Sequence, residues 1–107
     1  EVNMGINNLD YSTLTVTGSA QVLATACSPV MPSQTKGAVI TVEGAPVRWR
    51  DDGTAPTATE GQLMNVGDVL TFDSWTVPEQ NWKQILRAIQ FIRTTATSGL
   101  LKISWYD

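Results

Sequence analysis

The chain has 107 residues, one Cys and no His, and its formal net charge is −3 at pH 7. Without imidazole it cannot form a His-dependent catalytic triad or a zinc site with nitrogen ligands, and one Cys cannot close an internal disulfide. Seven basic residues against ten acidic ones do not supply the basic face that a phosphate backbone requires, so no nucleic-acid partner is expected.

The composition favours a binding or structural module over an enzyme. Charged residues make up 16% of the chain, against roughly a quarter in an average soluble domain. Thr is abundant instead, with fourteen residues, which is typical of β proteins and of proteins that bury part of their outer surface in an assembly. No run of about 18 apolar residues is present, so no membrane span is predicted, and no cofactor is indicated.

The first third of the chain divides into an arm and two predicted strands. Residues 1–10 are polar and lack a period, which predicts an N-terminal arm ahead of a single β domain over residues 11–107. Leu14 and Val16 alternate with Thr over residues 11–18, which predicts a strand. Residues 20–28 are apolar on both faces and predict a strand that is buried on both sides or lies at an interface.

The middle of the chain predicts a loop and then two more strands. Pro and Gly mark residues 28–37 as a loop, and residues 37–44 alternate with Ala38, Ile40 and Val42 on one face. Val47 and Trp49 share one face of the next strand.

Residues 51–54, Asp-Asp-Gly-Thr, then predict a turn, because Gly accepts a positive φ and Asp bonds its own nearby backbone. Short strands are expected over residues 62–65 and from residue 69 onward, the latter with Leu70 and Phe72 on one face.

The last third is ambiguous at its start. Residues 77–94 match both a helical and an extended template, and we predict a turn or short helix over 79–86 followed by a strand from about 88. Leu101, Ile103 and Trp105 then alternate with polar residues in a terminal strand. Seven to nine short strands predict an all-β fold, either a β-sandwich that resembles a jelly roll or a small barrel.

The acidic residues have two interpretations. Asp51 and Asp52, with the Thr54 hydroxyl, carry the oxygen ligands that calcium prefers, but turn formation with pairing to Arg48 or Arg50 is favoured. A glycosidase needs two facing carboxylates, and five acidic residues lie in or near one loop system, although solvated turn residues are the favoured interpretation: Asp51, Asp52, Glu60, Asp68 and Asp73.

Four Trp residues are many for this length. Trp49 and Trp105 lie on the apolar phase of strands and are predicted to pack in the core, so Trp49→Ala is expected to cost roughly 3–5 kcal/mol. Trp75 and Trp82 lie outside clear alternation. They are candidate partner-binding residues, either at a protein interface or as a platform for stacking sugars, and core packing remains open.

The cations are the second set of candidate partner-binding residues. Arg48 and Arg50 occupy the polar phase of one strand, and Arg93 and Lys102 occupy the polar phase of two others. On one sheet they would form a basic strip facing a partner's carboxylates. Local pairing with neighbouring acids, worth at most about 1 kcal/mol per exposed pair, is the favoured alternative. Cys27 is predicted to be a small buried hydrophobe.

One part of the chain resembles a known group of proteins. Its elements are the Arg-Trp-Arg-Asp-Asp-Gly-Thr run at residues 48–54, Pro-Thr at 56–57, a Gly-bounded strand pair over 61–72, Ile-Gln-Phe-Ile at 89–92 and a terminal strand ending in aromatics. Over residues 38–106 this pattern is similar to small virion structural proteins of tailed bacteriophages. The chain departs from the pattern by about ten inserted residues at 74–83, which carry Trp75 and Trp82.

The resemblance implies a β-sandwich capsid decoration (cement) protein. Such a protein binds the major capsid protein on the surface of the virion as a homo-oligomer, a trimer or a dimer, and it is assembled in the host cytoplasm. Two alternatives stay open: a head–tail or tail connector, and a carbohydrate-binding module on a virion fibre.

Overall fold

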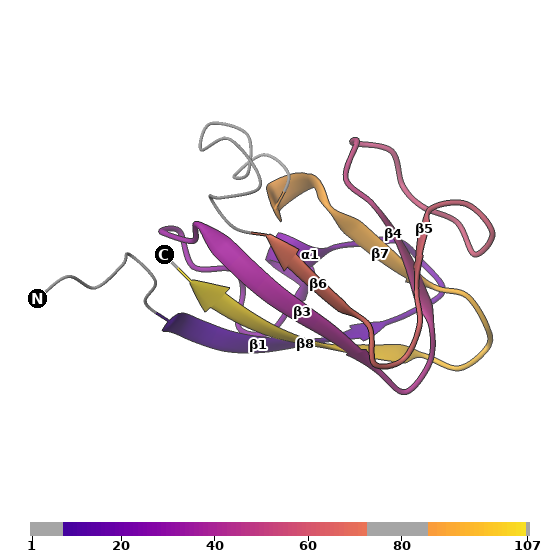
Figure 1. Cartoon of the computed structure of the whole chain (residues 1–107). Coiled ribbons are helices and arrows are strands. Elements are labelled where there is room, and N and C mark those ends of the chain that lie inside the picture. The colour runs from indigo at the N-terminus through magenta and orange to yellow at the C-terminus, as the bar shows by residue number, and fades with distance from the viewer. Residues whose placement is uncertain (1–7, 73–85, 107) are drawn as a thin grey trace, which may run out of the picture.

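The computed structural model describes residues 8–72 and 86–106. In this part the chain forms two antiparallel sheets of four strands each, stacked in two layers (Figure 1). The first sheet has the order β1-β8-β3-β6, and the second sheet has the order β2-β7-β4-β5. The bounds are β1 Asn8–Val16, β2 Gln21–Val22, α1 Leu23–Ala26, β3 Gly37–Glu43, β4 Val47–Arg50, β5 Gln62–Met64, β6 Val69–Phe72, β7 Gln90–Arg93 and β8 Gly99–Tyr106.

The predicted all-β class is confirmed, and its form is the open two-layer sandwich. Alternation places the apolar phase of each long strand between the layers. Leu101, Ile103 and Trp105 of β8 are fully buried, and Ile40 of β3 lies beside them in the sheet. One core cluster joins these residues to Val47, Met64 and Phe91 of the second sheet. Residues 86–88 are helical, and the rest of the helix or turn predicted over 79–86 lies outside the described residues.

The chain passes repeatedly between the two layers. Among the strands that the structure describes, six of the seven successive pairs lie in different sheets, and β4 and β5 both lie in the second sheet. Where β8 begins, the two layers come very close. A Cβ on Gly99 would lie 2.6 Å from Val47 Cγ1 and 2.8 Å from the Ala45 carbonyl oxygen, so this crossing needs a residue without a side chain.

Two segments differ from the sequence predictions. β1 begins at Asn8, so the last three residues assigned to the arm belong to a strand. The strand predicted over residues 20–28 is wrong beyond Val22, because the chain turns into α1 at Leu23. The Cys27 amide donates to the Leu23 carbonyl at 3.1 Å. Both side chains are buried, as their i, i+4 spacing on one helical face allows.

A buried polar chain links β8, β1 and the loop after α1. The Trp105 indole N–H donates to Ser12 Oγ at 2.8 Å, and Ser12 Oγ donates to the Pro29 carbonyl at 2.6 Å. Trp105 and Ser12 are both fully buried. Two backbone hydrogen bonds between Thr13 and Ser28, of 3.0 and 2.9 Å, hold the loop against the edge of β1.

The burial predicted for Trp105 and for Cys27 is confirmed. Desolvation raises the pKa of the Cys27 thiol.

Replacing Ser12 tests the importance of this chain. Ser12→Ala leaves the buried Trp105 N–H without its acceptor, so the free energy of unfolding should fall by about 1–3 kcal/mol in a urea titration. The matched control is Ser104→Ala, which removes a hydroxyl from the outward side of neighbouring β8 and should change stability by less than about 0.5 kcal/mol. Equal effects of the two changes would show that the indole does not depend on Ser12.

Candidate functional site

A hollow of about 340 Å³ opens where the chain leaves β4 and returns to β5. The loop over residues 51–61 joins these two strands and forms one wall of the hollow. Indole, guanidinium, carboxylate and amide groups line it together: Trp49, Arg50, Asp51, Asp52, Glu60, Gly61 and Gln62. The structure therefore brings one Trp, one Arg and three of the five acidic residues singled out from the sequence to one place.

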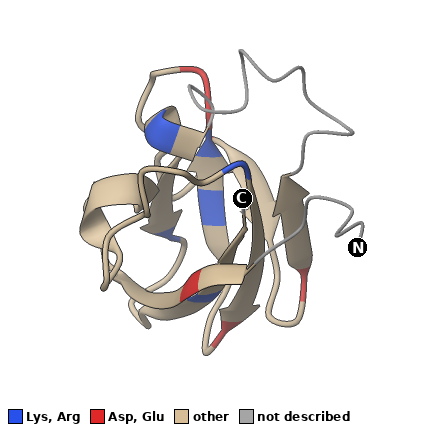
Figure 2. Cartoon of the chain, turned by 90° about the vertical axis from the view of Figure 1, so that its left-hand side faces the viewer, with Lys and Arg blue, Asp and Glu red and all other residues tan. Residues whose placement is uncertain are grey.

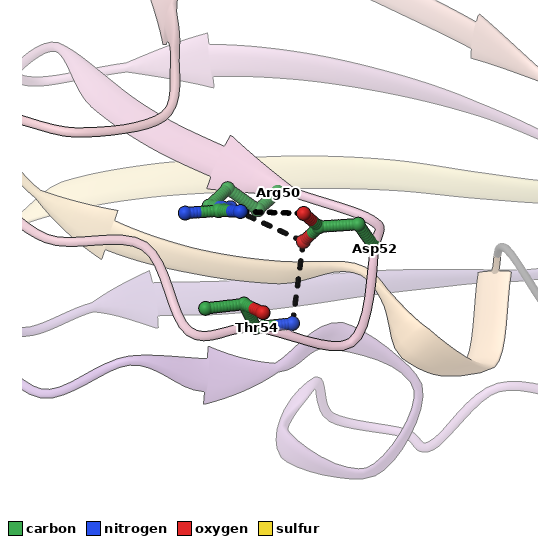
Figure 3. A network of polar contacts seen from close by, with 3 residues as sticks. All are labelled: Arg50, Asp52 and Thr54. Carbon is green, nitrogen blue, oxygen red and sulfur yellow. Dashed lines mark hydrogen bonds and ion pairs between the residues drawn. The ribbon is translucent and has the colours of Figure 1, made fainter.

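The predicted turn at residues 51–54 is confirmed and is closed by an ion pair (Figure 3). Arg50 Nε donates to Asp52 Oδ1 at 3.1 Å, and Arg50 Nη2 donates to Asp52 Oδ2, which makes the contact bidentate. The Thr54 amide also donates to Asp52 Oδ1, at 3.2 Å. Gly53 takes a φ of +86° between them. The hydrogen bonds from Arg50 and from the Thr54 amide lower the pKa of the Asp52 carboxyl.

Arg48 holds the other end of the loop. Its Nε donates to the Ala58 carbonyl at 3.1 Å and its Nη1 to the Gly61 carbonyl at 2.9 Å. Gly61 adopts a φ of +137°, and a Cβ there would lie 3.1 Å from the Trp49 carbonyl oxygen. Both arginines that the sequence offered for partner binding are therefore engaged within their own chain, Arg48 by backbone carbonyls and Arg50 by a carboxylate.

The four cations do not form a basic strip on one sheet, and the favoured alternative, local pairing with a neighbouring acid, is confirmed for Arg50 with Asp52. Arg48 and Arg50 lie on the outward face of the second sheet, whereas Arg93 is in register with inward-facing Val47. Lys102 belongs to β8 of the first sheet. The alternation assigned each cation to the polar side of its own strand, but it carried no information on which strands share a sheet. In Figure 2 the charged segments are scattered and most of the ribbon is uncharged.

Trp49 is less buried than predicted. It is partly exposed and packs against the core from its margin, where its ring meets Phe72 edge to face, with centroids 6.4 Å apart and planes at 77°. The reason is its position at the outer end of β4, beside the hollow. Trp75 and Trp82 lie outside the described residues.

Of the carboxylates in the hollow, Asp52 does not suit the general-acid role of a glycosidase. A general acid needs a raised pKa, and the pKa of Asp52 is lowered. Asp68 instead accepts the Asn65 amide at 2.8 Å within its own turn, and Asp73 lies outside the described residues. Within residues 8–72 and 86–106, no three His, Cys, Asp or Glu side chains gather as metal ligands.

A second feature, which the sequence interpretation missed, lies on the segment that links the two sheets. Leu63 of β5, Val66 in the turn and Val69 of β6 expose 48%, 54% and 59% of their surface. We call these three residues the β5–β6 rim. The Asp68 amide donates to the Asn65 carbonyl at 2.9 Å, and the Gly67 amide donates to the Val42 carbonyl at 2.9 Å, so this turn is tied to β3. The sequence signal that could have identified this rim is Val66, an apolar residue inside the Asn-Val-Gly-Asp turn.

Comparisons with protein-family models, with curated proteins and with solved structures gave no match. In the part of the chain that the structure describes, no helix is long and apolar enough to cross a membrane.

The partial exposure of Trp49 changes the expected cost of removing it. Trp49→Ala should lower the free energy of unfolding by about 2 kcal/mol, below the roughly 3–5 kcal/mol of a fully buried Trp. Trp49→Phe keeps an aromatic ring for the contact with Phe72 and should recover more than half of that loss. A loss as large as that of a fully buried Trp, measured in urea, would contradict the observed position of the ring.

The lowered pKa of Asp52 predicts a measurable pH response. Because its pKa in the folded chain lies below its unfolded value, the contact with Arg50 contributes stability above the unfolded pKa, and this contribution is lost as the pH falls through the folded pKa. Arg50→Gln should raise the Asp52 pKa in a carboxyl NMR titration. Arg87→Gln, an exposed change on another segment, should leave it where it is. An Asp52 titration that does not respond to Arg50→Gln would contradict the assignment.

Proposed function

We propose that the chain is a non-catalytic structural protein of a tailed-phage virion, and that it decorates the capsid by binding the assembled coat lattice. The resemblance over residues 38–106 supports this role. The observation that carries it is the β5–β6 rim, where three of the exposed large apolar side chains lie on one short connection. Leu63 is in register with Arg48 on the outward side of the second sheet, and Val69 is in register with Thr41 on the outward side of the first, so the rim offers apolar side chains on both sides of this edge to a protein partner.

The position of the β5–β6 rim suits contact with a shell. β5 ends the second sheet and β6 ends the first, so the rim lies along one edge of the sandwich. In the described part of the chain no strand pairs with the outer side of either β5 or β6. A small apolar contact binds weakly by itself, but an oligomer on a lattice makes several such contacts at once, and avidity then exceeds the single affinity.

The internal engagement of Arg48 and Arg50 also supports a contact that is apolar rather than ionic. Charge-based docking needs available cations or carboxylates, and these two cations already bond within the loop over residues 51–61. Two other functions stay predictions. A connector differs from a decoration protein in copy number, and the carbohydrate-binding alternative depends on Trp75 and Trp82, which lie outside the described residues.

Cosedimentation with purified shells tests the proposal. The native chain should pellet with assembled shells and not associate with free coat protein. The double change Leu63→Asp and Val66→Asp places charge on the β5–β6 rim and should weaken shell binding about tenfold or more.

The control is Val30→Asp, which places one added carboxylate, against two in the rim variant, at a Val of 58% exposure in the loop after α1; each rim substitution is also tested singly against it. Val30→Asp should bind like the native chain. A rim variant that binds shells as tightly as the native chain does would contradict the proposal. So would a native chain that binds free coat protein as tightly as it binds shells.

A further inference from the structure

The outward face of the first sheet is low in charge and extends over all four strands. Along each strand, the residues that alternate with the buried ones point to this side, and they are mainly Thr, Ser, Val, Leu and Tyr. One cross-strand row shows the pattern: Thr13 pairs with Lys102, Lys102 with Thr41, and Thr41 with Val69. Tyr11 lies on the same side and is 51% exposed. We call this surface the outer face.

Glu43 and Lys102 are the charged residues of this face in its β3 and β8 strands. Thr41 lies opposite Lys102, and Glu43 lies opposite Leu100, so the two charges are diagonal neighbours, roughly 7–8 Å apart at their backbones. The ion pair found among the described residues is Arg50 with Asp52; Glu43 and Lys102 do not form one with each other. The outer face therefore carries one positive and one negative site, side by side.

We infer that the outer face packs against the outer face of a second copy of this chain. A two-fold axis in the plane of the interface, running past Thr41 and Leu100, sets Lys102 of each copy against Glu43 of the other. The same axis places the uncharged Thr and apolar positions of one copy against uncharged positions of the other. A two-fold interface must be self-complementary in this way, and a neighbouring pair of opposite charges in an otherwise uncharged surface meets that condition.

The size of the outer face sets the strength of the dimer. Four strands about 4.8 Å apart, with about 3.4 Å per residue along the eight residues of β8, cover roughly 500 Å² in projection. Stable complexes bury about 800 Å² per partner, so the dimer should be weak and concentration-dependent. Val69 of the β5–β6 rim lies on the outer face and is covered in the dimer, whereas Leu63 on β5 and Val66 in the turn lie off this face and stay available.

Mixing two charge variants gives the sharpest test. Glu43→Lys alone places Lys against Lys102 of the other copy, and Lys102→Glu alone places Glu against Glu43. Each variant by itself should be monomeric at concentrations where the native chain dimerises, measured by sedimentation equilibrium. An equimolar mixture restores both opposite-charge contacts, so it should form a one-to-one dimer with at least tenfold higher affinity than either variant alone.

Mixing can restore a contact between two copies, but it cannot restore a contact within one chain. The mixing step therefore separates these two explanations. Glu60→Lys makes the same charge change in the loop over residues 51–61 and should dimerise like the native chain. A native chain that stays monomeric at several hundred micromolar, or variants that dimerise alone, would overturn the inference. The experiment uses no shells, so its failure is distinguishable from failure of capsid binding.

Discussion

The fold depends on a hydrogen-bond acceptor for the Trp105 indole N–H inside the apolar core. Trp105 brings the largest fully buried side chain to the middle of the sandwich, and a buried donor without an acceptor would offset much of that gain. Ser12 supplies the acceptor, and its own hydroxyl donates a hydrogen bond to the Pro29 carbonyl. This requirement fixes the register of β1 against β8 and holds the loop after α1 against the edge of β1. Among the side-chain hydrogen bonds of the described residues, the bond from Trp105 to Ser12 is the one that is buried at both ends.

The sequence predicted the parts of the fold that depend on a single strand. Alternation over residues 37–43 and 99–106 identified buried Ile40 and Trp105 correctly, because a period of two follows from strand geometry alone. The segment at 20–28 failed, since a continuous apolar run fits a buried strand and a buried helical turn equally well. Alternation also left open whether the four cations share one sheet, because the pairing of β7 with β4 and of β8 with β3 is a tertiary fact that local alternation does not contain.

The candidate surfaces follow from how the chain uses its few charges. Arg48 and Arg50 order the loop over residues 51–61 by bonding its carbonyls and Asp52, which leaves much of the outside to Thr and aliphatic side chains. The turn Asp-Asp-Gly-Thr was predictable from its residue types. The carbonyl partners of Arg48 were not, because backbone acceptors leave no mark in a sequence. The exposed apolar positions and the nearly uncharged outer face are the surfaces on which the two proposals rest.

The central claim is that many copies of the chain decorate a phage capsid, and copy number in purified particles tests it most directly. Quantitative mass spectrometry of gradient-purified virions, with the coat protein as the internal standard, measures this ratio. The account predicts copies in proportion to the coat lattice, so that one oligomer is present for each set of symmetry-related coat subunits. Fewer than about twelve copies per virion would contradict capsid-wide decoration.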